Sequence, residues 1–146
     1  MNEERDIRQA ALKYLAMREH SMLELKRKLF DKFDDLAIHD VLTELESQGL
    51  LSDERFTENY TRFRKGKGFG SLHIQSELRE RGVSEVLINK YVDANDESWM
   101  KLVKEVQKQR FGDPLPEDFQ EKAKQARFLQ SRGFTSDQIW HLMGEN

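Results

Sequence analysis

The feature that most restricts the fold of this chain is a helical pattern that occurs three times. Each copy holds a leucine followed by a short polar run, and these leucines, Leu29, Leu78 and Leu129, are separated by 49 and then 51 residues. Each copy continues with an isoleucine that has apolar residues three and four positions later; the isoleucines are Ile38, Ile88 and Ile139. A period of this length exceeds that of helix-pair repeats, which is about 34 residues, and therefore indicates three helices per repeat.

Local signals agree with helices throughout the chain. Ile7, Ala11 and Tyr14 have the spacing of an apolar stripe on one helix face. The segment Ser21–Glu24 has the pattern of a capping box, and Ser71 is expected to be an N-cap. A left-handed glycine cap is predicted at Gly49, Gly82 is predicted to end a helix, and Gly133 is expected between two helices. No segment alternates with period two and the chain has only 2 prolines, so we assign no strand.

We therefore predict an all-α fold of three tandem three-helix repeats that form one continuous domain. The expected repeats are residues 1–52, 53–95 and 96–146. Each repeat has only a small apolar face, because 37% of the residues are hydrophobic and 35% are charged. Stacking of neighbouring repeats would complete the core, so we expect an elongated, curved molecule.

Composition excludes several classes of function. The chain has no cysteine, which excludes disulfide frameworks, cysteine nucleophiles and cysteine zinc sites. No apolar run approaches the roughly 18 residues that cross a bilayer, and the first residues are too polar for a signal peptide, so we expect a cytoplasmic protein that contacts no membrane. The formal net charge is -3, so an anionic partner would have to be bound by a local patch.

The strongest local patch lies in positions 60–75, which contain four cations and no acidic residue. These cations are Arg62, Arg64, Lys65 and Lys67. They could bind phosphates or an acidic protein surface, and they are expected to be exposed. Tyr60 and Phe63 fall on the apolar stripe of the same helix, so we expect these rings to pack in the core rather than to stack on bases.

Further cations recur on the middle helix of each repeat. Those that we consider candidate contacts are Lys26, Arg27, Arg79, Arg81, Lys124, Arg127 and Arg132. Stacked repeats could align these cations into one basic stripe. Acidic residues are interleaved with them, however, so ordinary pairing on a solvated helix face is an open alternative.

No motif for catalysis or cofactor binding is found. The glycines at 66, 68 and 70 do not match the spacing of a phosphate-binding loop, and a helix rather than a strand precedes them. The four histidines are scattered and have no zinc-site spacing. We therefore expect neither a metal, a cofactor nor an enzymatic activity.

Three segments resemble the RecX family of RecA regulators. They are Gly49-Leu50-Leu51-Ser52-Asp53-Glu54-Arg55-Phe56, Lys65-Gly66-Lys67-Gly68 and Arg127-Phe128-Leu129-Gln130-Ser131-Arg132-Gly133-Phe134. Their order and spacing inside the three repeats extend the resemblance over nearly the whole chain. The first repeat departs from the pattern because it lacks the glycine that the other two have.

The resemblance implies a bacterial regulator of DNA repair and recombination that binds the RecA filament on single-stranded DNA. Such a protein modulates, and mainly inhibits, filament growth, strand exchange and ATP hydrolysis by RecA. We expect a monomer that acts through this contact, with weak direct contact to DNA as a further possibility. The alternative is a module that binds single-stranded DNA and competes with RecA for it, which the same charges permit.

Overall fold

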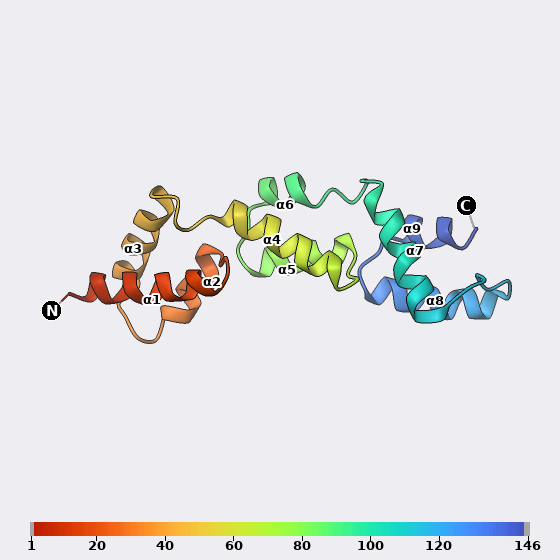
Figure 1. Ribbon diagram of the computed structural model, residues 1–146, viewed down its shortest axis with the longest axis horizontal. Coiled ribbons are helices and arrows are strands. Elements are labelled where there is room, and N and C mark those ends of the chain that lie inside the picture. Colours follow the sequence, from red (N-terminus) through yellow and green to blue (C-terminus); the bar gives the residue numbers. More distant parts are fainter. Residues whose placement is uncertain (1, 145–146) are drawn as a thin grey trace. The chain divides into compact units, whose positions relative to one another are not determined.

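The computed structural model describes residues 2–144, and this part of the chain contains nine α-helices and no strand (Figure 1). The prediction of an all-α tandem-repeat fold is confirmed. The helices are α1 (Glu3–Met17), α2 (Met22–Leu29), α3 (Asp35–Ser47), α4 (Asp53–Gly66), α5 (Ser71–Glu80), α6 (Glu85–Tyr91), α7 (Ser98–Phe111), α8 (Phe119–Ser131) and α9 (Ser136–Leu142).

The chain divides into two compact units. The first comprises Met1–Tyr60 and Leu78–Leu87, and the second comprises Thr61–Glu77 and Ile88–Asn146. The division passes through α4, α5 and α6, so the helices of the second repeat contribute to both units.

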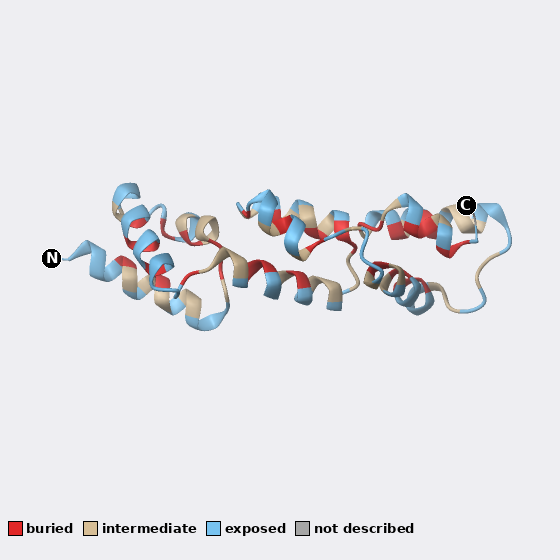
Figure 2. Cartoon of the chain, turned by 90° about the horizontal axis from the view of Figure 1, so that it is seen from above, coloured by how far each residue is buried: buried red, intermediate tan, exposed pale blue. Residues whose placement is uncertain are grey.

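In the first unit, α1, α2 and α3 pack against one another as a three-helix bundle. Figure 2 shows the buried residues of these helices along one side of each, as the apolar spacing predicts. The buried core consists of Ile7, Ala11, Leu25, Leu29, Ile38, Val41, Leu42, Leu45 and Leu51.

The predicted caps of the first unit are present. The Glu24 backbone N–H donates to Ser21 Oγ at 3.1 Å, and the Ser21 backbone N–H donates to the Glu24 carboxylate at 3.1 Å, which completes the capping box. Gly49 follows α3 with φ of +77°, a conformation that side chains with a Cβ rarely adopt.

In the second unit, α7, α8 and α9 pack pairwise around an apolar core. Trp99 is 1% exposed, and its indole N–H donates to the Asp93 carbonyl at 2.8 Å. Helix α9 begins with a capping box formed by Thr135 and Gln138, which the sequence analysis does not identify. The other buried apolar residues of these helices and their connections are Val103, Val106, Ala126, Leu129, Phe134, Ile139, Leu142 and Met143.

Within the first unit, the turn between α5 and α6 packs against the start of α2. Ser21 Oγ donates to the Arg81 carbonyl at 2.8 Å. Gly82 has φ of +79°, and a Cβ on this residue would lie 2.7 Å from Leu23 Cβ. Glycine is therefore required at this turn for two reasons, its backbone conformation and the close approach of α2.

Within the second unit, the turn between α8 and α9 packs in the same way against the start of α5. The Gly70 N–H donates to the Arg132 carbonyl at 2.8 Å, and the Leu72 N–H donates to the Gly133 carbonyl at 2.9 Å. A Cβ on Gly133 would lie 2.6 Å from the His73 backbone nitrogen. Gly82 and Gly133 therefore have the same role. Each allows the turn before the third helix of its repeat to pack against the start of the middle helix of the preceding repeat.

The first repeat lacks this glycine, and its turn is one residue shorter: Ile38 follows Leu29 by 9 residues, whereas Ile88 and Ile139 follow Leu78 and Leu129 by 10. The turn between α2 and α3 is exposed except for Phe33, which packs on the core of its own repeat. Phe33 therefore occupies the place of buried Val83 and Phe134, which follow the glycines of the other two repeats.

The prediction that Ser71 caps α5 is wrong. The helix begins at Ser71, and the Gly70 carbonyl accepts the first helical hydrogen bond from the Ile74 N–H at 3.2 Å. Gly70 occupies the N-cap position because the turn around Gly133 leaves no room there: a Cβ on Gly70 would lie 2.6 Å from the Gly133 oxygen.

Candidate partner-binding surface

Arg64 is held in an ion pair and is not freely exposed as expected. Its guanidinium donates two hydrogen bonds to the Glu77 carboxylate, at 2.9 and 3.1 Å, and lies 3.9 Å from the centre of the Phe69 ring. The Arg64 side chain is 21% exposed. The expectation of a free surface cation is wrong here, because α5 supplies a carboxylate thirteen residues away in the sequence.

Lys65 is also fixed by contacts within the second unit. Its ammonium donates to Ser98 Oγ at 3.1 Å and lies 4.3 Å from the centre of the Trp99 ring. Hydrogen bonds from Ser98, together with the nearby Lys65 charge, lower the pKa of Asp96. These contacts leave Lys65 half-buried and place its positive charge beside the first residues of α7.

Lys67 and Phe63 are exposed at the end of α4. The Lys67 ammonium lies 5.5 Å from the centre of the Phe63 ring, which is 59% exposed. The expectation that Phe63 packs in the core is wrong, because buried Thr57 and Thr61 share the inward face of α4 with Phe56. Tyr60 is half-buried, and Arg62 is exposed.

A basic groove lies between the end of α4, α7 and the end of α8. Its volume is about 380 Å³, and it is lined by Lys65, Gly66, Lys67, Gly68, Leu102, Glu105, Val106, Gln109, Arg110, Phe128 and Arg132. The lining contains four cations and one carboxylate. We refer to this feature as the basic groove.

Aromatic contacts, rather than ion pairs, hold the two arginines of the basic groove. The guanidinium groups of Arg110 and Arg132 lie 4.8 and 5.2 Å from the centre of the Phe128 ring. Among residues 2–144, no carboxylate forms an ion pair with Lys67, Arg110 or Arg132. The groove therefore presents positive charge that the chain does not neutralise, which favours a carboxylate or phosphate ligand.

Arg79 and Arg81 belong to the first unit and pair with carboxylates there. Arg79 forms an exposed ion pair with Glu85, and their hydrogen bond raises the pKa of Arg79 and lowers that of Glu85. Arg81 lies 3.5 Å from the Glu24 carboxylate and 4.9 Å from the centre of the Tyr60 ring. Both arginines therefore lie at the turn between α5 and α6, next to Gly82.

The remaining predicted contacts lie on the other two middle helices. Lys26 and Arg27 lie on α2 in the first unit, where the Arg27 guanidinium donates to the Glu80 carbonyl at 3.0 Å. Lys124 and Arg127 are exposed on α8 in the second unit and do not line the basic groove. The structure thus brings together Lys65, Lys67 and Arg132 of the predicted set.

The basic groove also contains Arg110 and Phe128, which the sequence analysis does not select as site residues. One signal could have pointed to Arg110, since it lies two residues before the helix-ending Gly112, as Arg64 lies two residues before Gly66. No local signal distinguishes Phe128, because its contacts come from α7 and from the end of its own helix.

The segment Gly49–Phe56 has a structural role in the first unit. Asp53 Oδ1 accepts from the Met22 backbone N–H at 2.8 Å, and Arg55 pairs with Glu19 at 2.9 Å. Burial raises the pKa of the Asp53 carboxyl, and the hydrogen bond from Met22 opposes this shift. Leu51 and Phe56 are 1% and 2% exposed, so this segment joins the first repeat to the start of α4.

Family comparisons cover most of the chain. The models of the first, second and third three-helix domains of RecX match residues 8–45, 52–91 and 96–143. The chain belongs to the RecX family. A Regulatory protein RecX from Halorhodospira halophila is 41% identical over 91% of this chain and 83% of its own length. One from Pseudomonas putida is 36% identical over 94% of this chain and 88% of its own length.

Solved RecX structures share the fold. The crystal structure of RecX from Lactobacillus salivarius matches with a TM-score of 0.82 and 18% identity, over 97% of this chain and 95% of the other. The crystal structure of a regulatory protein RecX matches with a TM-score of 0.80 and 19% identity, over 97% of this chain and 71% of the other. These likenesses establish the tandem arrangement of helices, and the curated relatives establish a regulatory family.

Between residues 2 and 144, no group of three or more His, Asp or Glu side chains is placed to hold a metal ion. None of the helices there is long and apolar enough to span a membrane.

Proposed function

We propose that this RecX family chain regulates a RecA filament in the cytoplasm, mainly by inhibiting filament growth, strand exchange and ATP hydrolysis. The chain acts by binding and not as an enzyme. Membership of the family supports RecA as the partner.

The observation that carries the proposed contact is the unneutralised charge of the basic groove. Lys67, Arg110 and Arg132 have no carboxylate partner within the described residues, whereas Arg64, Arg79 and Arg81 do. Cations that are already paired gain less from a new anionic ligand, because the existing pair must first be broken. We therefore assign the first three residues as the principal contacts, in place of Arg64, Arg79 and Arg81.

The aromatic contacts favour an acidic protein surface over single-stranded DNA as the ligand of the groove. Proteins that bind single strands generally stack bases on free aromatic faces. Guanidinium groups already lie over Phe69 and Phe128, and His73 stacks on Phe69 at 4.7 Å. Exposed Phe63 beside Lys67 is the one feature of this region that supports the alternative of direct competition for DNA.

The test uses a groove variant that carries both Lys67→Glu and Arg110→Glu. Its control carries Lys101→Glu and Lys104→Glu on α7, which change the net charge by the same amount outside the basic groove. All four residues are exposed in the second unit, so both variants should fold. ATP hydrolysis and filament length are followed during titration into RecA on single-stranded DNA. We expect the groove variant to require at least tenfold more protein for half-inhibition, and the control to change less than threefold.

A parallel titration with fluorescent oligothymidylate, without RecA, separates the two modes of action. If the groove variant loses affinity for the oligonucleotide and retains full inhibition of RecA, the groove is a DNA contact and our assignment is wrong. Inhibition by the unmodified chain should also weaken as salt is raised, because the contact is electrostatic.

A further inference from the structure

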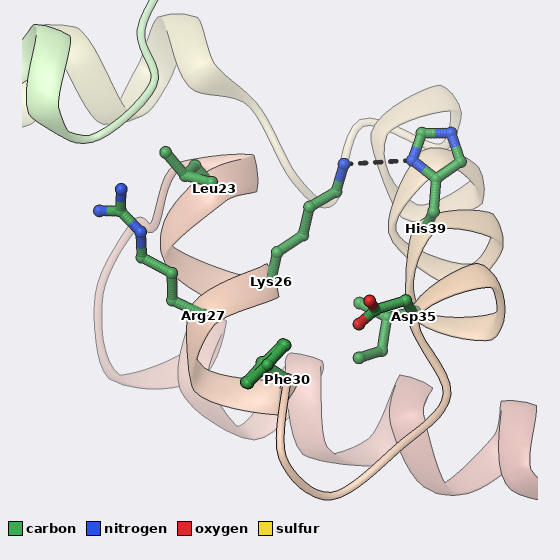
Figure 3. A pocket seen from close by; sticks show the side chains of 7 residues that line it. Leu23, Lys26, Arg27, Phe30, Asp35 and His39 are labelled. Atoms are coloured by element: carbon green, nitrogen blue, oxygen red, sulfur yellow. Dashed lines mark hydrogen bonds between the residues drawn. The ribbon is translucent and has the colours of Figure 1, made fainter.

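A second hollow lies on the first repeat, between α2 and α3 (Figure 3). Its volume is about 420 Å³, within the range of small ligand sites. It is lined by Leu23, Lys26, Arg27, Phe30, Asp35, Ile38 and His39. None of these residues contributes to the basic groove.

The apolar part of this hollow is built on fixed side chains. Ile38 is 2% exposed and belongs to the core of the first unit, so it forms a firm base. Leu23 is held from the other side by the close approach of Gly82. Phe30, by contrast, is 65% exposed at the end of α2 and offers an uncovered aromatic surface. An exposed aromatic side chain beside a firm apolar base is typical of a recognition site for one apolar side chain.

The cationic part of the hollow lacks an acidic partner. Lys26 Nζ lies 3.1 Å from His39 Nδ1, and the two side chains point toward each other across the hollow. Arg27 donates to the Glu80 carbonyl, which orients its guanidinium and leaves its charge in place. Within the described chain, neither Lys26 nor Arg27 forms an ion pair, although Asp35 lies on the same rim.

We propose that this hollow binds an acidic peptide segment in which one bulky apolar side chain is flanked by carboxylates. The apolar side chain packs between Phe30, Leu23 and Ile38, and the carboxylates pair with Lys26 and Arg27. Charge complementarity selects the acidic segment, because the lining contains two cations, Lys26 and Arg27, and one carboxylate, Asp35. The apolar lining disfavours a phosphate backbone, because the charges of such a ligand repeat along its whole length and it has no bulky apolar side chain to pack between Leu23, Phe30 and Ile38.

The test uses the full-length chain without RecA, so its outcome does not depend on the proposed function. The probe is a fluorescein-labelled peptide of ten residues with two Asp and two Glu around a single Phe, followed by fluorescence anisotropy. We expect binding that Phe30→Ser and Lys26→Gln each weaken about tenfold, which corresponds to about 1.4 kcal/mol. Leu36→Ser is the matched control: Leu36 is 76% exposed on α3, does not line the hollow and should change affinity less than twofold.

Two altered peptides test the two parts of the ligand. A peptide with Ser in place of Phe, and one with Asn and Gln in place of the acids, should each bind at least tenfold more weakly. The proposal is overturned if the original peptide does not bind at millimolar concentration, or if Phe30→Ser leaves its affinity unchanged. It is also overturned if oligothymidylate binds with an affinity that Phe30→Ser and Lys26→Gln reduce, since the hollow would then be a nucleic-acid site.

Discussion

The close packing around Gly133, where the α8–α9 turn meets the start of α5, allows the free-energy cost of one added methyl group to be worked out from the structure. In a Gly133→Ala variant, the φ of +99° places an alanine in a region that costs about 1–2 kcal/mol for residues with a Cβ. The new Cβ would also lie 2.6 Å from the backbone nitrogen of His73, which cannot move away by changing a rotamer. Overpacking of this kind costs about 1–3 kcal/mol, so the total is about 2–5 kcal/mol.

Gly49→Ala provides the matched control, because Gly49 closes α3 with the same pair of backbone hydrogen bonds with which Gly133 closes α8. Gly49 has φ of +77°, but nothing lies within 4 Å of the position of its Cβ. The control should therefore lose only the conformational part, about 1–2 kcal/mol. The difference between the two variants isolates the close approach of the α8–α9 turn to α5.

The assay is urea unfolding followed by circular dichroism, together with thermal melting. For a chain of 146 residues, 1 kcal/mol corresponds to about 2–4 °C in the melting temperature, so the overpacking of about 1–3 kcal/mol should make Gly133→Ala melt about 2–12 °C below Gly49→Ala. Equal free energies of unfolding for the two variants would refute the packing of this turn against the backbone of α5.

Three further predictions concern charged and titratable side chains. Arg64→Gln should lower the free energy of unfolding by about 1–2 kcal/mol, because Glu77 loses a partner that donates two hydrogen bonds. Lys67→Gln is the control, and because Lys67 is exposed it should change the free energy of unfolding by less than about 0.5 kcal/mol. Equal effects of the two variants in urea unfolding would contradict the structural role of Arg64. Burial lowers the pKa of His20, so the unfolded chain binds more protons than the folded chain, and the free energy of unfolding should fall as the pH drops below about 6.5. Unfolding curves at pH 5.5 and 7.5 should show a smaller difference for His20→Gln than for the unmodified chain. An equal difference would show that His20 is not the group responsible. Asp53→Ala should destabilise the chain by about 1 kcal/mol through loss of the hydrogen bond from the Met22 N–H, while Asp53→Asn, which keeps an acceptor, should recover most of that loss in the same measurement.

Much of the fold could be predicted because its determinants are local. The spacing of Ile7 and Ala11, the capping box at Ser21 and Glu24, and the left-handed glycines all act over a few residues of chain. The alignment of Leu29, Leu78 and Leu129 adds the tandem arrangement, because identical spacing of apolar residues buries identical helix faces. The exposed position of Phe63 could not be predicted in this way, since threonines on α4 compete for the same inward face.

The candidate site depended on tertiary structure, because the chemistry of a cation depends on its neighbours in space. In the sequence, Arg64 and Lys67 are equivalent members of one basic cluster. In the fold, Glu77 neutralises Arg64, whereas Lys67 lies in a groove with Arg110 and Arg132, more than forty residues away in the chain. The sequence alone determined the helices, the capping box of α2 and the repeat. Only the tertiary structure decided which cations form ion pairs within the chain and which remain available to a partner. The reason is that an ion pair depends on a distance of a few ångströms between two groups and not on the number of residues between them.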